Sequence, residues 1–97
     1  MERGSDGTPP LLLAASIGRT EVVKVLLAAG VDPNRTRTSD GLFPLYAAAS
    51  AGRLVIVEAL VDAKVNVDAR MLETNQTAIF AAAGGDHVDV LEVLIGA

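Results

Sequence analysis

The chain repeats one phrase three times at an interval of 34 residues. Residues 7–15 align with residues 41–49 and with residues 75–83, and each copy ends in two or three consecutive alanines. A fixed period in this range indicates stacked supersecondary units, because a single unit cannot bury its apolar face alone. The sequence therefore predicts an all-α fold, an α-solenoid of three stacked helix-turn-helix repeats. These repeats occupy one domain, residues 1–97, at approximately 7–40, 41–74 and 75–97.

Each unit is expected to contain a short inner helix, a tight break and an outer helix. In the first unit, Pro10 can occupy an early helical position, where its missing N–H removes no hydrogen bond, and residues 11–17 continue the helix. Gly18 ends this helix in a left-handed conformation, Thr20 caps the outer helix, and Gly30 ends that helix in turn. The outer helices carry apolar stripes at helical spacing, namely Val22, Val23, Leu26 and Leu27, then Ile56, Val57, Leu60 and Val61, then Val90, Leu91, Leu94 and Ile95.

Three turn positions change residue type between the units. Lys64 stands where the first unit has Gly30, which weakens the stop of the second outer helix. Asn75 replaces Gly41, and because Asn enters positive φ more readily than most residues, we expect a left-handed turn there. Asp86 takes the place of the glycine that breaks the first two units, and we expect it to cap the following helix.

These phrases resemble the ankyrin repeat. The likeness lies in a Pro-Leu step, paired alanines, a glycine break and pairs of branched apolar residues, repeated in phase over nearly the whole chain. The residues that carry it are Pro10, Leu11, Ala14, Ala15, Gly18, Arg19, Val22, Val23, Leu26, Leu27 and residues 30–34, then Pro44, Leu45, Ala48, Ala49, Gly52, Arg53, Ile56 and Val57, then Thr77, Ala78, Ile79, Ala82, Ala83, His87, Val90 and Leu91. The resemblance implies a scaffold whose inner helices and protruding loops hold another protein.

The units depart from the family's pattern in period, in one side chain and at the ends. The period is 34 residues rather than about 33, which adds one residue to each protruding loop. The family's histidine is replaced by Leu12, Tyr46 and Phe80, and we expect an apolar ladder, with the aromatic rings packing between repeats, instead of that histidine's hydrogen bonds.

Neither end presents the polar face that an isolated solenoid needs for solubility. We therefore expect a fragment of a longer array, or a small subunit, with further repeats or partner subunits covering the apolar ends. A self-sufficient domain of three repeats is the alternative.

No group of residues predicts catalysis, a metal site or a cofactor. The chain has no cysteine, and therefore no thiolate nucleophile or thiolate metal ligand. The single histidine, His87, is flanked by Asp86 and Asp89, which suit a helix N-terminus better than convergence on one metal ion. The serines lie in no nucleophile motif, and no glycine-rich phosphate loop is present. We expect a protein that is not an enzyme and has no catalytic residue, metal or cofactor.

The charge distribution argues against nucleic acid as a partner. All eight Lys and Arg residues lie within residues 1–70 beside eight acidic residues, whereas residues 71–97 contain four acidic residues and nothing basic. A nucleic-acid binder would carry a basic stripe. The longest apolar run, residues 11–15, is far shorter than the roughly 20 residues that span a bilayer, and no segment resembles a signal peptide. We expect no membrane insertion and an intracellular, cytoplasmic location.

Two polar loops, residues 36–40 and 70–74, are expected to protrude as hairpin-like turns. Their arginines could bind carboxylates or phosphates through bidentate hydrogen bonds, and exposed Leu42, Met71 and Leu72 could act as apolar anchors. A solvated loop without a preferred partner, and packing of Leu72 on the neighbouring loop, are the alternatives. By resemblance, the candidate protein-binding residues are Arg35, Thr36, Arg37, Ser39, Asp40, Leu42, Ser50, Arg70, Met71, Leu72, Glu73, Thr74 and Gln76.

The leading functional hypothesis is a non-catalytic protein–protein interaction module. Its basis is the absence of a chemical site together with an extended, rigid surface. The alternative is a structural accessory subunit that stabilises a larger assembly through its apolar ends.

Overall fold

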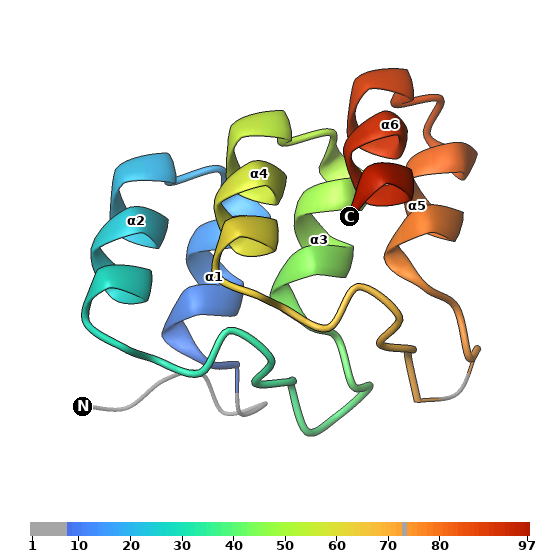
Figure 1. Ribbon diagram of the computed structural model, residues 1–97. Coiled ribbons are helices and arrows are strands. Elements are labelled where there is room, and N and C mark those ends of the chain that lie inside the picture. The colour runs from blue at the N-terminus through green and yellow to red at the C-terminus, as the bar shows by residue number, and fades with distance from the viewer. Residues whose placement is uncertain (1–7, 73) are drawn as a thin grey trace.

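The structure is a computed structural model that describes residues 8–72 and 74–97. These residues form the helices α1 (Pro10–Ile17), α2 (Thr20–Ala28), α3 (Pro44–Ala51), α4 (Leu54–Asp62), α5 (Ala78–Gly84) and α6 (Val88–Gly96). Helices α1, α3 and α5 lie side by side in an inner layer, and α2, α4 and α6 form an outer layer (Figure 1). Each helix packs against its partner in the same repeat and against the equivalent helix of the next repeat. The predicted solenoid of three stacked helix-turn-helix repeats is confirmed.

The inner helices begin with residues that suit a first turn. Pro10 and Pro44 are the first residues of α1 and α3, where the missing N–H leaves no helical carbonyl without a donor. Helix α5 begins at Ala78 instead, and the Oγ1 of Thr77 accepts a hydrogen bond from the backbone N–H of Phe80 at 3.4 Å. Thr77 therefore caps the third inner helix, whereas proline begins the first two.

The inner helices are followed by residues in the left-handed conformation. The φ angle is 81° at Gly18, 72° at Gly52 and 60° at Asp86. The prediction that Asp86 caps α6 is wrong, because Asp86 lies in this turn and no side chain makes a cap hydrogen bond at that helix. Thr20 does not cap α2 either, because it is already the first residue of the helix.

The stops of the outer helices are alike in the first two repeats. Gly30 and Lys64 both adopt positive φ, at 88° and 66°, and α2 and α4 each contain nine residues. The expected weakening of the second stop therefore does not lengthen α4.

The core lies between the two layers and between successive repeats. Its largest fully buried side chains are Leu12, Leu45, Ile56, Leu60, Leu94, Val23, Val57, Val90 and Pro44. The inner helices meet through small buried residues such as Ala15, Ala48 and Ala82, which let the backbones approach closely. The sequence's many alanines thus set the close spacing of the inner layer.

The apolar ladder predicted at Leu12, Tyr46 and Phe80 is only partly present. Leu12 is fully buried, but Tyr46 is half-buried and its hydroxyl donates a hydrogen bond to the Oε1 of Gln76 at 2.8 Å. The Tyr46 ring also meets the ring of Phe43 edge-on, with centroids 5.8 Å apart. Phe80 is 55% exposed, because no further repeat of the described chain packs on it. The three residues therefore do not all form the predicted apolar ladder.

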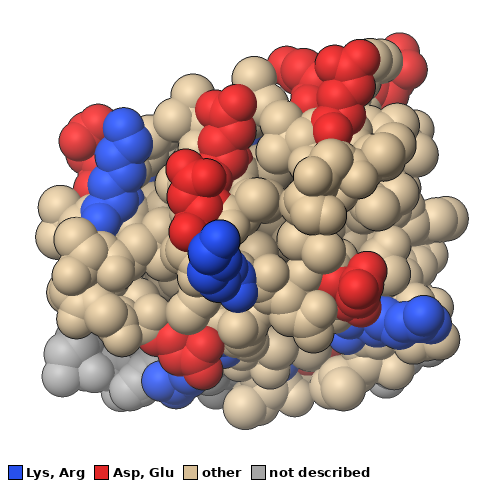
Figure 2. Space-filling view, viewed as in Figure 1, with Lys and Arg blue, Asp and Glu red and all other residues tan. Residues whose placement is uncertain are grey.

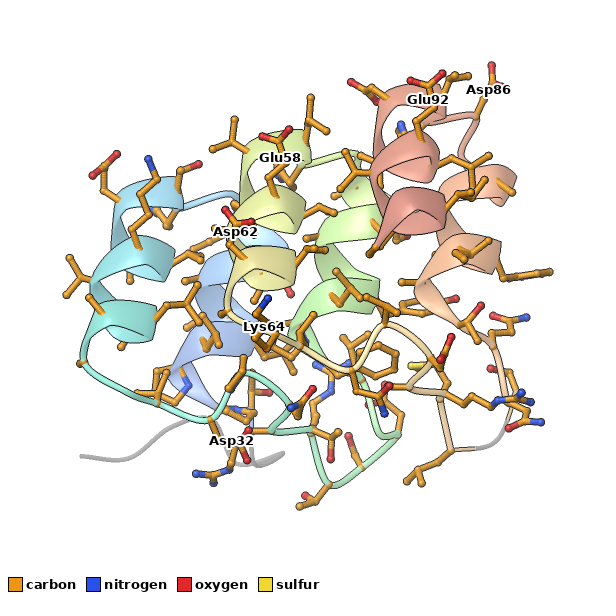
Figure 3. The ribbon with its side chains drawn as sticks, viewed as in Figure 1. Asp32, Glu58, Asp62, Lys64, Asp86 and Glu92 are labelled. Carbon is orange, nitrogen blue, oxygen red and sulfur yellow. The ribbon has the colours of Figure 1, made fainter. Side chains whose placement is uncertain are left out.

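On the face that Figure 2 shows, charged side chains lie on the outer layer and along the loops. Glu58 and Asp62 project outward from α4, Glu92 projects from α6, and Asp86 lies in the turn before α6 (Figure 3). The outer surface near the C-terminal repeat is consequently acidic, as the sequence's charge asymmetry predicts.

Candidate protein-binding edge

The loop between α2 and α3 closes as a hairpin. The backbone N–H of Arg37 donates to the carbonyl of Leu42 at 2.8 Å, and the N–H of Gly41 donates to the carbonyl of Arg37 at 2.8 Å. Gly41 reverses the chain with a φ of 76°, a conformation that glycine adopts without steric cost. The hairpin-like turn predicted for residues 36–40 is confirmed.

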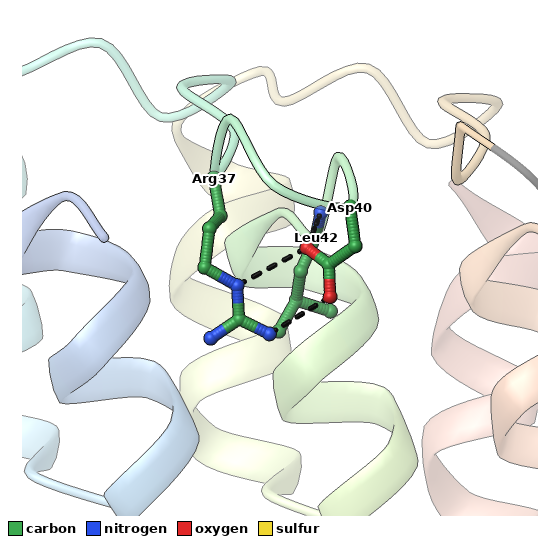
Figure 4. A network of polar contacts seen from close by, with 3 residues as sticks. All are labelled: Arg37, Asp40 and Leu42. Carbon is green, nitrogen blue, oxygen red and sulfur yellow. Dashed lines mark hydrogen bonds and ion pairs between the residues drawn. The ribbon is translucent and has the colours of Figure 1, made fainter. Parts of the chain in front are cut away.

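A side-chain ion pair braces this hairpin from within (Figure 4). The Nε of Arg37 donates to Oδ1 of Asp40 at 3.1 Å, and its Nη2 donates to Oδ2 at 2.9 Å. The same Oδ1 accepts the backbone N–H of Leu42 at 3.0 Å. The hydrogen bonds from Arg37, followed by the one from Leu42, lower the pKa of Asp40 below its ordinary value. The carboxylate is therefore held ionised and fixes the shape of the loop.

The loop between α4 and α5 has the same construction. The N–H of Met71 donates to the carbonyl of Gln76 at 2.9 Å, and the N–H of Asn75 donates to the carbonyl of Met71 at 3.1 Å. Asn75 has a φ of 62°, so the left-handed turn predicted at this position is confirmed. Both loops therefore present the same hairpin, one repeat apart.

The two hairpins are joined into one surface, which we call the loop edge (residues 35–42, 70–72 and 74–76). The N–H of Leu72 donates to the carbonyl of Asp40 at 3.4 Å. A Cβ at Gly41 would lie 2.5 Å from the Cγ of Leu72, so only glycine lets this side chain cross the first loop. Leu72 nevertheless stays 67% exposed. Both alternatives for Leu72 are therefore true at the same time, because its side chain packs on the neighbouring loop and remains accessible.

A second junction between repeats lies at the opposite ends of the inner helices. The Nε2 of His87 donates to the carbonyl of Ser50 at 3.1 Å, and a Cβ at Gly52 would lie 2.6 Å from its Nδ1. Arg53 covers Gly18 in the same way, with its Cζ 2.7 Å from the Cβ position. Sequence reasoning considered His87 as part of the ankyrin resemblance and as a metal or catalytic candidate, and it missed this contact. The repeat period could have indicated this contact, because Arg53 and His87 are 34 residues apart and each directly follows a break position.

Comparison with known families agrees with this architecture. A family model described as ankyrin repeats, in three copies, matches residues 11–97. The chain belongs to the ankyrin-repeat family. Among curated proteins, none matches the chain significantly. Ankyrin repeats are in general protein–protein interaction modules and typically lack catalytic activity.

The ankyrin fold brings most of the predicted protein-binding residues together on the loop edge. The exposed members are Arg35, Thr36, Ser39, Arg70, Leu72 and Thr74, and the half-buried members are Arg37, Asp40, Leu42, Met71 and Gln76. Ser50 is exposed near the far end of α3, roughly 9 Å along a helix that rises about 1.5 Å per residue. Glu73 lies outside the described residues. The predicted set thus forms one cluster and one separate position.

Two of these residues differ from their predicted state. Met71 is not an exposed anchor, because its side chain is half-buried and packs against the core of the ankyrin repeats. Arg37 already binds the carboxylate of Asp40, so its guanidinium is not a free group at the loop tip. Residue type alone suggested both roles, and the loop's own contacts determine otherwise.

Outside the loop edge, the described residues of the ankyrin repeats bring no convergent chemical site together. Within residues 8–72 and 74–97, no three His, Asp or Glu side chains lie close enough to hold a metal ion. An open hollow of about 560 Å³ lies beyond the end of α4, lined by Val61, Asp62, Lys64, Val65, Val67 and Ala97. No helix in the described part of the chain is long and apolar enough to cross a membrane.

Proposed function

We propose that this ankyrin-repeat protein is a non-catalytic protein–protein interaction module whose loop edge binds its partner. In this proposal Arg35 and Arg70 bind carboxylates of the partner, and Leu72 enters an apolar pocket beside them. Exposed hydroxyls of Thr36, Ser39 and Thr74 form the polar rim.

The observation that carries the proposal is the internal bracing of the loop edge. Backbone hydrogen bonds close each hairpin, and the N–H of Leu72 ties the second hairpin to the carbonyl of Asp40. The Arg37–Asp40 ion pair fixes the first hairpin further. A surface that is ordered before binding loses little conformational entropy on association, which raises the affinity available from a given set of contacts.

The accessible groups on the edge favour an acidic partner surface with an apolar residue. The side chains of Arg35 and Arg70 are exposed and make no ion pair with any described residue. Guanidinium groups bind carboxylates in a bidentate manner, and an exposed leucine amid polar loops can act as an anchor. Ser50 lies on the neighbouring inner-helix surface, where a larger partner would extend its contact.

The proposal is tested by partner capture followed by a direct binding measurement. The immobilised chain is incubated with an extract of the cells that produce it, and retained proteins are identified and purified. Titration calorimetry then compares Arg35→Ala, Arg70→Ala and Leu72→Ala with Lys24→Ala, a matched control on the exposed face of α2. Each arginine change should weaken binding about fivefold, near 1 kcal/mol, and Leu72→Ala should weaken it by at least about fivefold.

The control variant should bind like the unmodified chain, and all four should keep the same helical circular dichroism. Unchanged affinity in the three edge variants would reject the loop edge as the binding surface. A loss of helical signal would instead attribute the effect to misfolding, and charge-reversed Arg35→Glu and Arg70→Glu would then replace the alanine variants.

A second candidate function is a structural accessory subunit that contacts other protein through its apolar ends. The observation in its favour is the exposure of large apolar side chains at the last repeat, notably Phe80 and Ile95. Further repeats or partner subunits would cover these groups.

A further inference from the structure

Equivalent positions in the three repeats differ systematically in exposure. Val22 on α2 is 47% exposed, whereas its equivalents Ile56 and Val90 are 1% and 0% exposed. Leu13 on α1 is likewise exposed, and its equivalent Ala47 is buried. These positions are buried or half-buried wherever a preceding repeat is present. We call Leu13, Val22 and Val25 the leading end.

The opposite pattern holds in the last repeat. Phe80 is exposed, whereas its equivalents Leu12 and Tyr46 are fully buried and half-buried. Ala83 is exposed, whereas its equivalents Ala15 and Ala49 are fully buried. These positions are buried or half-buried wherever a following repeat is present. We call Phe80, Ala83 and Ile95 the trailing end.

The leading and trailing ends are therefore the two halves of the interface that already joins successive repeats. Inside the chain, each inner and each outer helix packs against the equivalent helix of the adjacent repeat, and both sets of positions are less exposed there. The two ends lie on opposite sides of the molecule, at α1–α2 and at α5–α6 (Figure 1). We propose that the trailing end of one copy of this chain stacks on the leading end of a second copy, continuing the solenoid head to tail.

Charge complementarity at the break positions favours a second copy as the occupant. Inside the chain, Arg53 lies over Gly18, and His87 lies over Gly52. In the proposed stack, Arg19 of the following copy takes this place over Asp86 of the preceding copy. The side chains of Arg19 and Asp86 are both exposed, and neither has a partner among the described residues.

Asp86 carries a Cβ and a carboxylate where the internal junctions have glycine. A Cβ at Gly18 would approach the Cζ of Arg53, which is the far end of a long flexible side chain. An arginine can shift there by rotamer changes, and at the junction between copies its shifted guanidinium meets a carboxylate. The charge pair is specific to this junction, because neither internal junction contains it.

The symmetry of the contact determines what assembles. A head-to-tail contact uses two different surfaces, so it does not close after two copies and instead produces open chains of variable length. The inference uses the ends of the solenoid and not the loop edge, so its failure leaves the loop-edge function standing. For the second candidate function, in which the apolar ends make the contact, the inference names the partner as a second copy of this chain.

Sedimentation velocity with two blocking variants tests the inference. Val22→Glu blocks the leading end, and Phe80→Glu blocks the trailing end; both sites are exposed, so the helical circular dichroism should not change. The unmodified chain should form species larger than a dimer as its concentration rises. Each variant alone should stay monomeric, and an equimolar mixture should form a dimer and nothing larger.

Charge exchange tests the Arg19–Asp86 contact in the same assay. Arg19→Glu should weaken assembly at least about fivefold, and adding Asp86→Arg in the same chain should restore it. Lys24→Glu, on the exposed face of α2, makes the same charge change and should leave assembly intact.

Three outcomes would overturn the proposal. They are an unmodified chain that stays monomeric at every concentration, a blocking variant that still dimerises alone, and a mixture of blocking variants that stays monomeric. Dimerisation of one blocking variant would indicate a symmetric contact between like ends. If the variants lose helical signal, Leu13→Lys and Ala83→Glu replace them.

Discussion

Substitution of Gly52 by alanine isolates the contact between the second and third repeats. Gly52 has a φ of 72°, and a Cβ there would lie 2.6 Å from the Nδ1 of His87. Gly30 has a similar φ of 88°, but a Cβ there would meet nothing within 4 Å. Comparing Gly30→Ala with Gly52→Ala therefore separates the backbone effect, which both share, from the displacement of the His87 ring.

The expected magnitudes follow from these two effects. A residue with a Cβ in the left-handed conformation costs roughly 1–2 kcal/mol, and this term applies to both variants. In Gly52→Ala the ring of His87 must also move, which breaks its hydrogen bond to the carbonyl of Ser50. A lost hydrogen bond costs about 0.5–1.5 kcal/mol. We expect about 1–2 kcal/mol of destabilisation for Gly30→Ala and about 1.5–3.5 kcal/mol for Gly52→Ala.

Urea unfolding followed by circular dichroism measures both free energies of unfolding. A difference of about 0.5–1.5 kcal/mol between the variants supports the steric role of His87. The double variant with His87→Ala should show less additional loss at Gly52, because the clashing ring is then gone. Equal destabilisation by Gly30→Ala and Gly52→Ala would refute the argument.

Two further contacts give separate predictions. Tyr46→Phe removes the donor to Gln76 and should reduce the free energy of unfolding by about 0.5–1.5 kcal/mol, measured by urea unfolding; unchanged stability would show that the bond contributes nothing. Asp40 has a lowered pKa in the folded chain, so its contribution to stability is complete above the unfolded value of about 3.9 and is lost as the pH falls through the lower folded pKa. Asp40→Asn should therefore flatten the acid-induced loss of stability in urea unfolding measured across that window, and an identical pH dependence would contradict the role of the Arg37 pair.

The sequence was sufficient to predict the architecture because the repeat period and the backbone-specific residues act locally. Pro10 and Pro44 begin inner helices, and Gly18 and Gly52 end them, through their own backbone preferences. The left-handed turn at Asn75 could be predicted for the same reason, namely the backbone preference of asparagine. Three in-phase copies then indicated how the units stack.

Side-chain roles were less predictable because they depend on contacts between repeats or within the loops. Met71 and Leu72 are adjacent and both apolar, yet one packs on the core and the other crosses Gly41 into solvent. Phe80 occupies the same repeat position as Leu12, yet Phe80, in the last described repeat, is 55% exposed, and Leu12, in the first, is fully buried. Arg37 looked available for a partner because its pairing with Asp40 depends on the folded hairpin.

The packing of each helix on its own partner and on the adjacent repeat also bears on how such a gene can change. A duplication that inserts one whole 34-residue unit between two existing units would recreate the same junction on either side. An insertion of any other length inside the helices or their tight breaks would shift glycines, alanines and prolines out of step with their neighbours. This architecture can therefore lengthen in whole units without rebuilding its core, while its loops diversify independently.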